Sequence, residues 1–148
     1  MRTAPVPGDR DRLSRRRLRR VVLGSGLVAT VAGLDTAVRG VRSFAGVRAP
    51  GEPAVESETR FYGAVYLALG ISTVSLSRRA DRDPAGVRAL AGTIFLAGLA
   101  RAGAWRTAGA PHPLQRALLA VELVGPPALV AWQASLRGTP DTDPASSA

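Results

Sequence analysis

Four long apolar segments with few charged positions alternate with polar connections along the chain. Each is close to the roughly 20 residues that a helix needs to cross a bilayer. The pattern therefore predicts membrane-spanning helices over about 21–38, 57–77, 87–105 and 114–136. Two of the three connections are short polar turns, which join antiparallel neighbours in helix bundles.

The apolar segments are too poor in charge for a soluble bundle. Helices of a soluble bundle carry a polar stripe, but Val21–Leu34 and Phe61–Leu76 contain no charged residue. Glycine and alanine recur instead, as in Gly63 and Gly70, which are seven residues apart and share a face. Small residues let membrane helices approach closely. We therefore predict an all-α fold, an integral membrane four-helix antiparallel bundle.

The longest connection runs over 39–58. Val41, Phe44 and Val47 recur there every three residues, with arginines between them. This spacing predicts a short amphipathic helix lying on the membrane surface. The helix would end at Pro50 and Gly51.

Composition narrows the chemistry of the chain. Its 148 residues fit one domain, and they include no cysteine and a single histidine. Disulfides, zinc thiolate sites and multi-histidine metal sites are thereby excluded. The sequence offers no nucleophile–base pair, metal-ligand set or phosphate-binding loop. We expect no enzyme activity, no catalytic residues, no metal and no cofactor.

Positive charge is concentrated at the N-terminus. Residues 1–20 hold eight Arg and two Asp, a net +6 of the whole chain's +9. We predict that this stretch is a disordered cytoplasmic tail. Because the arginine run abuts an apolar segment, it is typical of an anchor to anionic lipids. The predicted membrane-surface anchors are Arg15, Arg16, Arg17, Arg19, Arg20, Arg78 and Arg79.

Three further readings concern the ends of the chain. A soluble helical nucleic-acid-binding protein is an alternative, but the apolar segments disfavour it and we expect no nucleic acid. Ser14-Arg15-Arg16 resembles a twin-arginine export signal, but no A-x-A cleavage site follows. The first helix is therefore expected to stay uncleaved. The turn-rich stretch 137–148 is predicted to be disordered.

Arginine counts predict the orientation. Twelve Arg lie in 1–20 and 78–88, against six in 39–60 and 106–116. Arginine accumulates on the cytoplasmic side. We therefore predict a multi-pass protein of the bacterial inner membrane with both termini cytoplasmic.

This orientation brings four charged residues into the outer half of the bundle: Asp35, Arg60, Arg101 and Glu122. Glu122 lies about 12 Å along the fourth helix at 1.5 Å per residue. A carboxylate at that depth needs a partner, and Arg101 on the preceding helix is the predicted one. The pair could be a structural tie between helices, or a ligand or proton site.

Two consecutive prolines follow Glu122. Pro126 and Pro127 remove backbone donors for the carbonyls of Glu122 and Leu123. Each proline also disfavours helical geometry in the residue before it. The sequence therefore predicts a kink near Gly125, and exposed carbonyls of this kind line sites in some transporters.

Several of these residues lie in motifs that resemble a known family. The motifs are ESETRFYGAVYLALG (Glu56–Gly70), LAGLARAGAW (Leu96–Trp105), GAPHP (Gly109–Pro113) and VELVGPP (Val121–Pro127). They resemble the family named domain of unknown function 4345, small bacterial membrane proteins with four predicted helices. The resemblance covers roughly residues 24–132. It implies four helices and a membrane location, but no activity.

Three functional classes remain open from the sequence, and the third, a membrane enzyme, has the least support. The first is a structural or accessory bundle that associates with other membrane proteins or with copies of itself. The second is a carrier or sensor of a proton, cation or small lipophilic molecule that uses the charge cluster. A cavity reaching Glu122 would favour the second, and a packed centre the first.

Overall fold

The computed structural model describes residues 7–47 and 51–136, and all regular structure in this part of the chain is helical. The predicted all-α fold with four long helices is thus confirmed. The stretch 137–148, predicted to be disordered, lies outside the described residues. The elements are α1 (Pro7–Arg39), the 3-10 turn η1 (Gly40–Ser43), α2 (Pro53–Ser77), α3 (Pro84–Ala108) and α4 (Pro113–Ser135).

Capping side chains define the starts of two helices. The carboxylate of Asp83 accepts the backbone N–H of Gly86 at 2.8 Å, and Pro84 occupies the first turn of α3. This is the helix start that Asp-Pro favours. The ring Nδ1 of His112 accepts the N–H of Leu114 at 3.3 Å and caps α4.

α1 extends into the stretch that was predicted to be disordered. That prediction is wrong for residues 7–20, and residues 1–6 lie outside the described part. The reason is that the arginine-rich turns carry an apolar edge: Leu18 and Val22 are fully buried. Arginine also has a high helix propensity, and Arg19 has a carboxylate partner that offsets repulsion.

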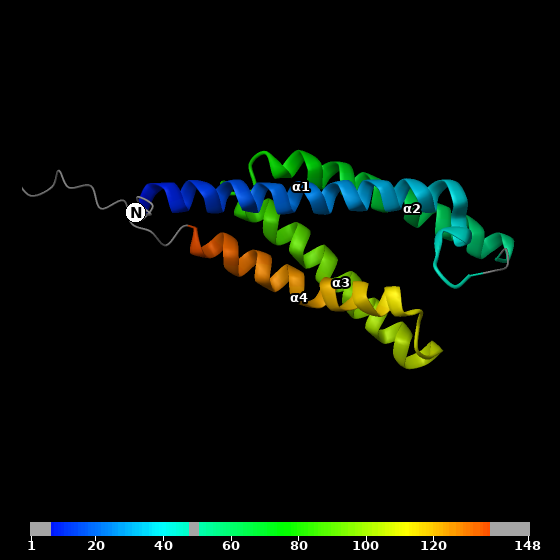
Figure 1. The fold of residues 1–148 in the computed structure, drawn as a ribbon. Helices are drawn as coiled ribbons and strands as arrows, with labels where there is room; N and C mark the ends of the chain where they lie inside the picture. The colour runs from blue at the N-terminus through cyan, green and yellow to red at the C-terminus, as the bar shows by residue number, and fades with distance from the viewer. Residues whose placement is uncertain (1–6, 48–50, 137–148) are drawn as a thin grey trace, which may run out of the picture.

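α1 and α2 lie side by side along their length (Figure 1). Their backbones approach so closely that a Cβ on any of four glycines would clash with backbone atoms of the facing helix. Close packing of this kind drives the association of helices in a membrane, where the hydrophobic effect contributes little. The face shared by Gly63 and Gly70 is confirmed. The facing pairs are Gly26 with Val74, Thr30 with Gly70, Gly33 with Leu67, and Ala37 with Gly63.

α3 and α4 form a second antiparallel pair, which diverges from the first (Figure 1). The two pairs meet at the end where α1 begins and α4 ends, and the buried apolar core lies there. From this core the pairs diverge toward the other end of the molecule. The core contains Val22, Leu76, Ala80, Val87 and Leu90, with Leu69, Ile94 and Leu129 packed against it.

Three helical stretches are long and apolar enough to cross a membrane: Asp11–Ser43, Pro84–Ala108 and Pro113–Ser135. Their surfaces expose large apolar side chains. In water, each Å² of such exposed apolar surface would cost roughly 25 cal/mol of free energy. An apolar solvent suits this surface, and the protein is therefore membrane-associated. The most exposed of these side chains, at 65–68%, are Val28, Val31, Leu96, Val121 and Val124.

α2 is not among these three stretches. Its first turns carry Glu56, Glu58 and Arg60, and hydroxyl side chains dilute the apolar residues that follow. Four membrane passes therefore stay a prediction.

The connection after α1 contains a 3-10 turn instead of the predicted amphipathic helix. That prediction is wrong for residues 44–47, because the helical turn ends at Ser43. Gly40 adopts a φ of +59°, a conformation that commonly ends helices. Glu56 then accepts the N–H of Val41 at 3.2 Å, which holds the chain in the turn. Residues 48–50 lie outside the described part.

Candidate functional site

The predicted pairing of Arg101 with Glu122 is confirmed. Arg101 Nε donates to Glu122 Oε2 and Nη2 donates to Oε1, each at 2.9 Å. This parallel two-bond geometry is the strongest form of an arginine–carboxylate contact. The Glu122 side chain is 15% exposed and that of Arg101 36%. One guanidinium thus occupies both carboxylate oxygens and neutralises their charge.

A glycine on α3 brings α4 close enough for this pair. A Cβ at Gly98 would lie 3.0 Å from the Cβ of Glu122 and 3.0 Å from Leu123 Cδ2. Gly98 is one turn before Arg101, so the close approach places the carboxylate beside the guanidinium.

The four charges of the predicted cluster form separate ion pairs. Asp35 pairs with Arg39 at 3.1 Å, and Arg60 pairs with Glu56 at 2.8 Å. Both partners are i,i+4 neighbours on the same helix, where opposite charges meet without crossing to another helix. Among the described ion pairs, none links Asp35 or Arg60 to Glu122.

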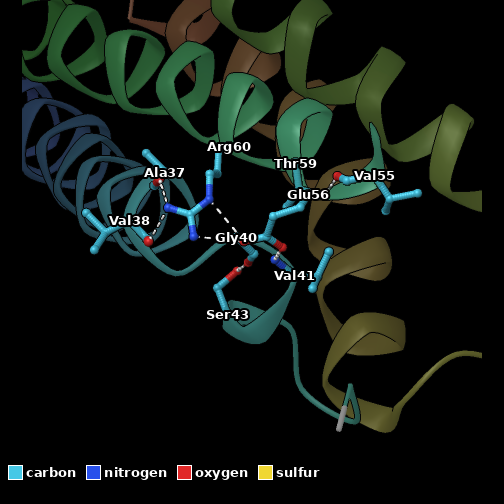
Figure 2. A network of polar contacts seen from close by, with 9 residues as sticks. All are labelled: Ala37, Val38, Gly40, Val41, Ser43, Val55, Glu56, Thr59 and Arg60. Atoms are coloured by element: carbon cyan, nitrogen blue, oxygen red, sulfur yellow. Dashed lines mark hydrogen bonds and ion pairs between the residues drawn. The ribbon is translucent and has the colours of Figure 1, made fainter. Parts of the chain in front are cut away.

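Arg60 instead belongs to a polar network where α1 ends and α2 begins (Figure 2). Its Nη1 donates to the carbonyls of Ala37 at 3.3 Å and Val38 at 2.5 Å. These carbonyls lie in the last turn of α1, where a cation is favoured by the helix dipole. Arg60 therefore caps α1 from the neighbouring helix.

Glu56 connects the other parts of this network (Figure 2). Its Oε2 accepts the Val41 N–H, and its Oε1 accepts two N–H groups of Arg60, at 3.0 and 2.8 Å. The backbone N–H of Val41 and then the Arg60 guanidinium lower the pKa of the Glu56 carboxyl. A side chain on Gly40 would collide with this carboxylate. Glu56 thus fixes the turn and Arg60 together.

A second ion pair joins α1 to the turn between α2 and α3. Arg19 donates to both oxygens of Asp81, at 2.7 and 3.0 Å. The Asp81 side chain is only 4% exposed and that of Arg19 38%. Burial acts to raise the pKa of Asp81, but the hydrogen bonds from Arg19, the backbone N–H of Asp81 and the charges of Arg19 and Arg82 together outweigh burial, and the pKa is lowered. The prediction that Arg19 is a lipid anchor is therefore corrected: its head group is held by a buried carboxylate.

Three more hydrogen bonds close the same end of the bundle. Gln133 is buried and donates its amide N–H to the carbonyl of Ala80 at 2.6 Å. Trp132 Nε1 donates to Ser14 Oγ at 2.9 Å. Arg15, also predicted as an anchor, donates to the carbonyl of Leu136 at 2.9 Å. These bonds tie α4 to α1 and to the α2–α3 turn.

The remaining predicted anchors are exposed. Arg79 pairs with Asp83 at 3.1 Å, but its side chain is largely in solvent. For all five, contact with anionic lipids stays a prediction. These residues are Arg16, Arg17, Arg20, Arg78 and Arg79.

α4 passes through the two prolines as one continuous helix. Pro126 is buried, and neither it nor Pro127 has an N–H to offer to the preceding turn. The kink predicted near Gly125 stays a prediction.

Sequence reasoning missed Glu56, Asp81 and Gln133 as structural residues. Glu56 precedes Arg60 by four residues, a spacing that favours an ion pair and could have been noticed. Gln133 is the amide in the second half of an otherwise apolar span, which is also a signal. Asp81 lies in a polar turn, where its sequence context does not distinguish it from a solvent-exposed acid.

The fold and its internal ion pairs define a small, all-α, membrane-associated protein. The family described as Domain of unknown function (DUF4345) matches residues 18–133, most of the chain. The chain belongs to this family, as its motifs predicted. Neither the comparison with curated proteins nor that with solved structures gave a match.

Proposed function

We propose that this protein is a structural or accessory bundle of the bacterial inner membrane that associates with other membrane proteins or with copies of itself. The observation that carries the proposal is an exposed stripe of mostly small residues along α3. Helices in membranes associate through such faces because small side chains let backbones approach.

The stripe faces away from the rest of the molecule. Its members follow one another at intervals of four or three residues, which keeps them on one side of a helix, and all are exposed. A Cβ at Gly92 or Gly103 would meet nothing within 4 Å. The members are Ala85, Ala89, Gly92, Leu96, Ala100, Gly103 and Thr107.

The chain already uses this spacing for helix contact elsewhere. On α1, Gly26, Thr30, Gly33 and Ala37 also recur at intervals of four and three residues, and α2 lies against them. α3 presents a comparable face with no helix of this chain, within its described part, packed on Gly92 or Gly103. This similarity supports the proposal that a partner helix packs against this face of α3.

The topology we propose has four passes with both termini cytoplasmic. α2 accompanies α1 along its length, which supports a fourth pass despite the lower apolarity of α2. The arginine excess in 1–20 and 78–88 supports a cytoplasmic location for that end.

The carrier or sensor hypothesis has less support. Both oxygens of Glu122 are already bonded to Arg101. Two hollows on the described surface are lined by other residues, one by apolar side chains of α1 and one at the α1–α2 connection. A ligand at Glu122 would have to displace the guanidinium, at a cost of several kcal/mol if the charge stayed buried.

Cysteine cross-linking in native membranes tests the proposal, since the chain has no cysteine of its own. Gly92→Cys and Gly103→Cys should give a discrete cross-linked product with a short bismaleimide. Val124→Cys on α4 is the matched control, because this position is also exposed but lies outside the stripe. A similar diffuse background from all three variants would contradict the proposal.

A further inference from the structure

A hollow of about 460 Å³ lies where α1 ends and α2 begins. Three guanidinium groups and one carboxylate border it, a net charge of +2 that Asp35, paired with Arg39, lowers to +1. Such an excess of positive charge in a concave site attracts anions. The lining residues are Val38, Arg39, Arg42, Glu56 and Arg60.

Two of the three arginines are held in place by the protein. Arg60 is fixed by Glu56 and by the last carbonyls of α1 (Figure 2). Arg39 donates to Asp35 at 3.1 Å and to the carbonyl of Arg42 at 3.1 Å. Their positions are therefore set before any ligand arrives, which lowers the entropy cost of binding.

The third arginine is uncommitted. The exposed guanidinium of Arg42 makes no hydrogen bond or ion pair with the described residues. An arginine fork presents five N–H donors in the geometry that phosphate oxygens accept. Arg42 can thus close on an anion in the hollow without breaking an internal contact.

A second hollow follows on α1, and it is apolar. It is lined by Leu27, Val28, Val31 and Ala32. Val31 and Val38 are seven residues apart, so the two hollows lie in line along one face, about 10 Å apart at 1.5 Å per residue. Asp35 lies between them, and its charge is neutralised by Arg39.

We propose that the arginine-lined hollow binds the phosphate of an anionic phospholipid, with an acyl chain lying along the apolar hollow. The charged hollow lies at the end of the membrane-spanning part of α1, where headgroups are found. A soluble phosphate ester would use the first hollow alone, whereas a lipid uses both. The inference holds whichever side of the membrane this end faces.

Native mass spectrometry of the full chain in detergent tests the proposal. The protein is titrated with phosphatidylglycerol, with phosphatidylcholine of the same acyl chains, and with glycerol 3-phosphate. We expect preferential binding of phosphatidylglycerol. Arg42→Gln should weaken it about five-fold, the contribution of one arginine near a membrane surface. Arg106→Gln, an exposed arginine outside the hollow, is the control.

Two results would overturn the proposal. Equal losses in Arg42→Gln and Arg106→Gln would mean that general surface charge, and not the hollow, attracts the lipid. Competition by glycerol 3-phosphate at the concentrations where phosphatidylglycerol binds would mean that the ligand is a soluble phosphate ester. Because the Arg42 side chain has no internal hydrogen bond or ion pair to lose, the helical circular dichroism of Arg42→Gln should equal that of the wild type.

Discussion

Arg101 and Glu122 join α3 to α4 through two parallel hydrogen bonds of 2.9 Å. The bonds pair two charges that each lie in an apolar stretch of their helix. Removing one partner of such a pair leaves an uncompensated charge, which costs about 3 to 5 kcal/mol in buried sites. The pair therefore sets the register of the second hairpin.

Gly98 should be essential for that register. Replacing Gly98 with Val would force Glu122 and Leu123 away, because even a Cβ there lies 3.0 Å from their side chains. We expect a loss of about 1 to 3 kcal/mol from overpacking. Thermal unfolding in detergent measures it. Ala97→Val, at an exposed position of the same helix outside the small-residue stripe, is the control, and an equal loss there would contradict the packing argument.

The α1–α2 contact makes a similar prediction for a smaller change. Gly33→Ala should lower the unfolding temperature, because its Cβ would collide with the backbone of Leu67, which a rotamer change cannot relieve. Gly24→Ala on the same helix meets nothing within 4 Å. It should be neutral or more stable by up to about 1 kcal/mol, since alanine is the better helix former. A stable Gly33→Ala protein would rule out the close approach.

The Arg19–Asp81 pair predicts a pH dependence. The folded-state pKa of Asp81 is lowered, so its contribution is present above the unfolded pKa of about 4 and is lost as pH falls through the folded pKa. Asp81→Asn should cost about 1 to 3 kcal/mol at pH 7, the range for a charged hydrogen bond.

Unfolding midpoints of wild type and Asp81→Asn, measured from pH 7 to pH 3, check this dependence. The difference between the two proteins should be largest near neutral pH and shrink below pH 4. Other carboxylates titrate in both proteins and cancel in the comparison. A difference that stays constant with pH would show that the charge of Asp81 is not what stabilises this end.

The four helices were predictable because long apolar spans and turn residues are local signals. The Arg101–Glu122 pair was predictable for a related reason. An intramembrane carboxylate needs a partner, and the predicted topology left few basic residues that could reach Glu122. The helix over residues 7–20 was not predictable, because it depends on Leu18 and Arg19 meeting residues far along the chain. Repulsion between neighbouring arginines predicted disorder instead.

The sequence also could not predict that Asp35 and Arg60 form ion pairs apart from Glu122. Counting residues from helix ends gives depth but not the face on which a side chain lies. Each of the two charges pairs with an oppositely charged neighbour one turn away on its own helix.

A double-mutant cycle tests most directly whether the central pair is structural. Unfolding and membrane abundance are measured for Arg101→Met, Glu122→Gln and the combined variant. If the pair is a tie between α3 and α4, each single change lowers both quantities and the combined variant is no worse than either alone. Single variants with wild-type stability and abundance, accompanied by a cellular defect, would contradict the account and identify Glu122 as a functional site.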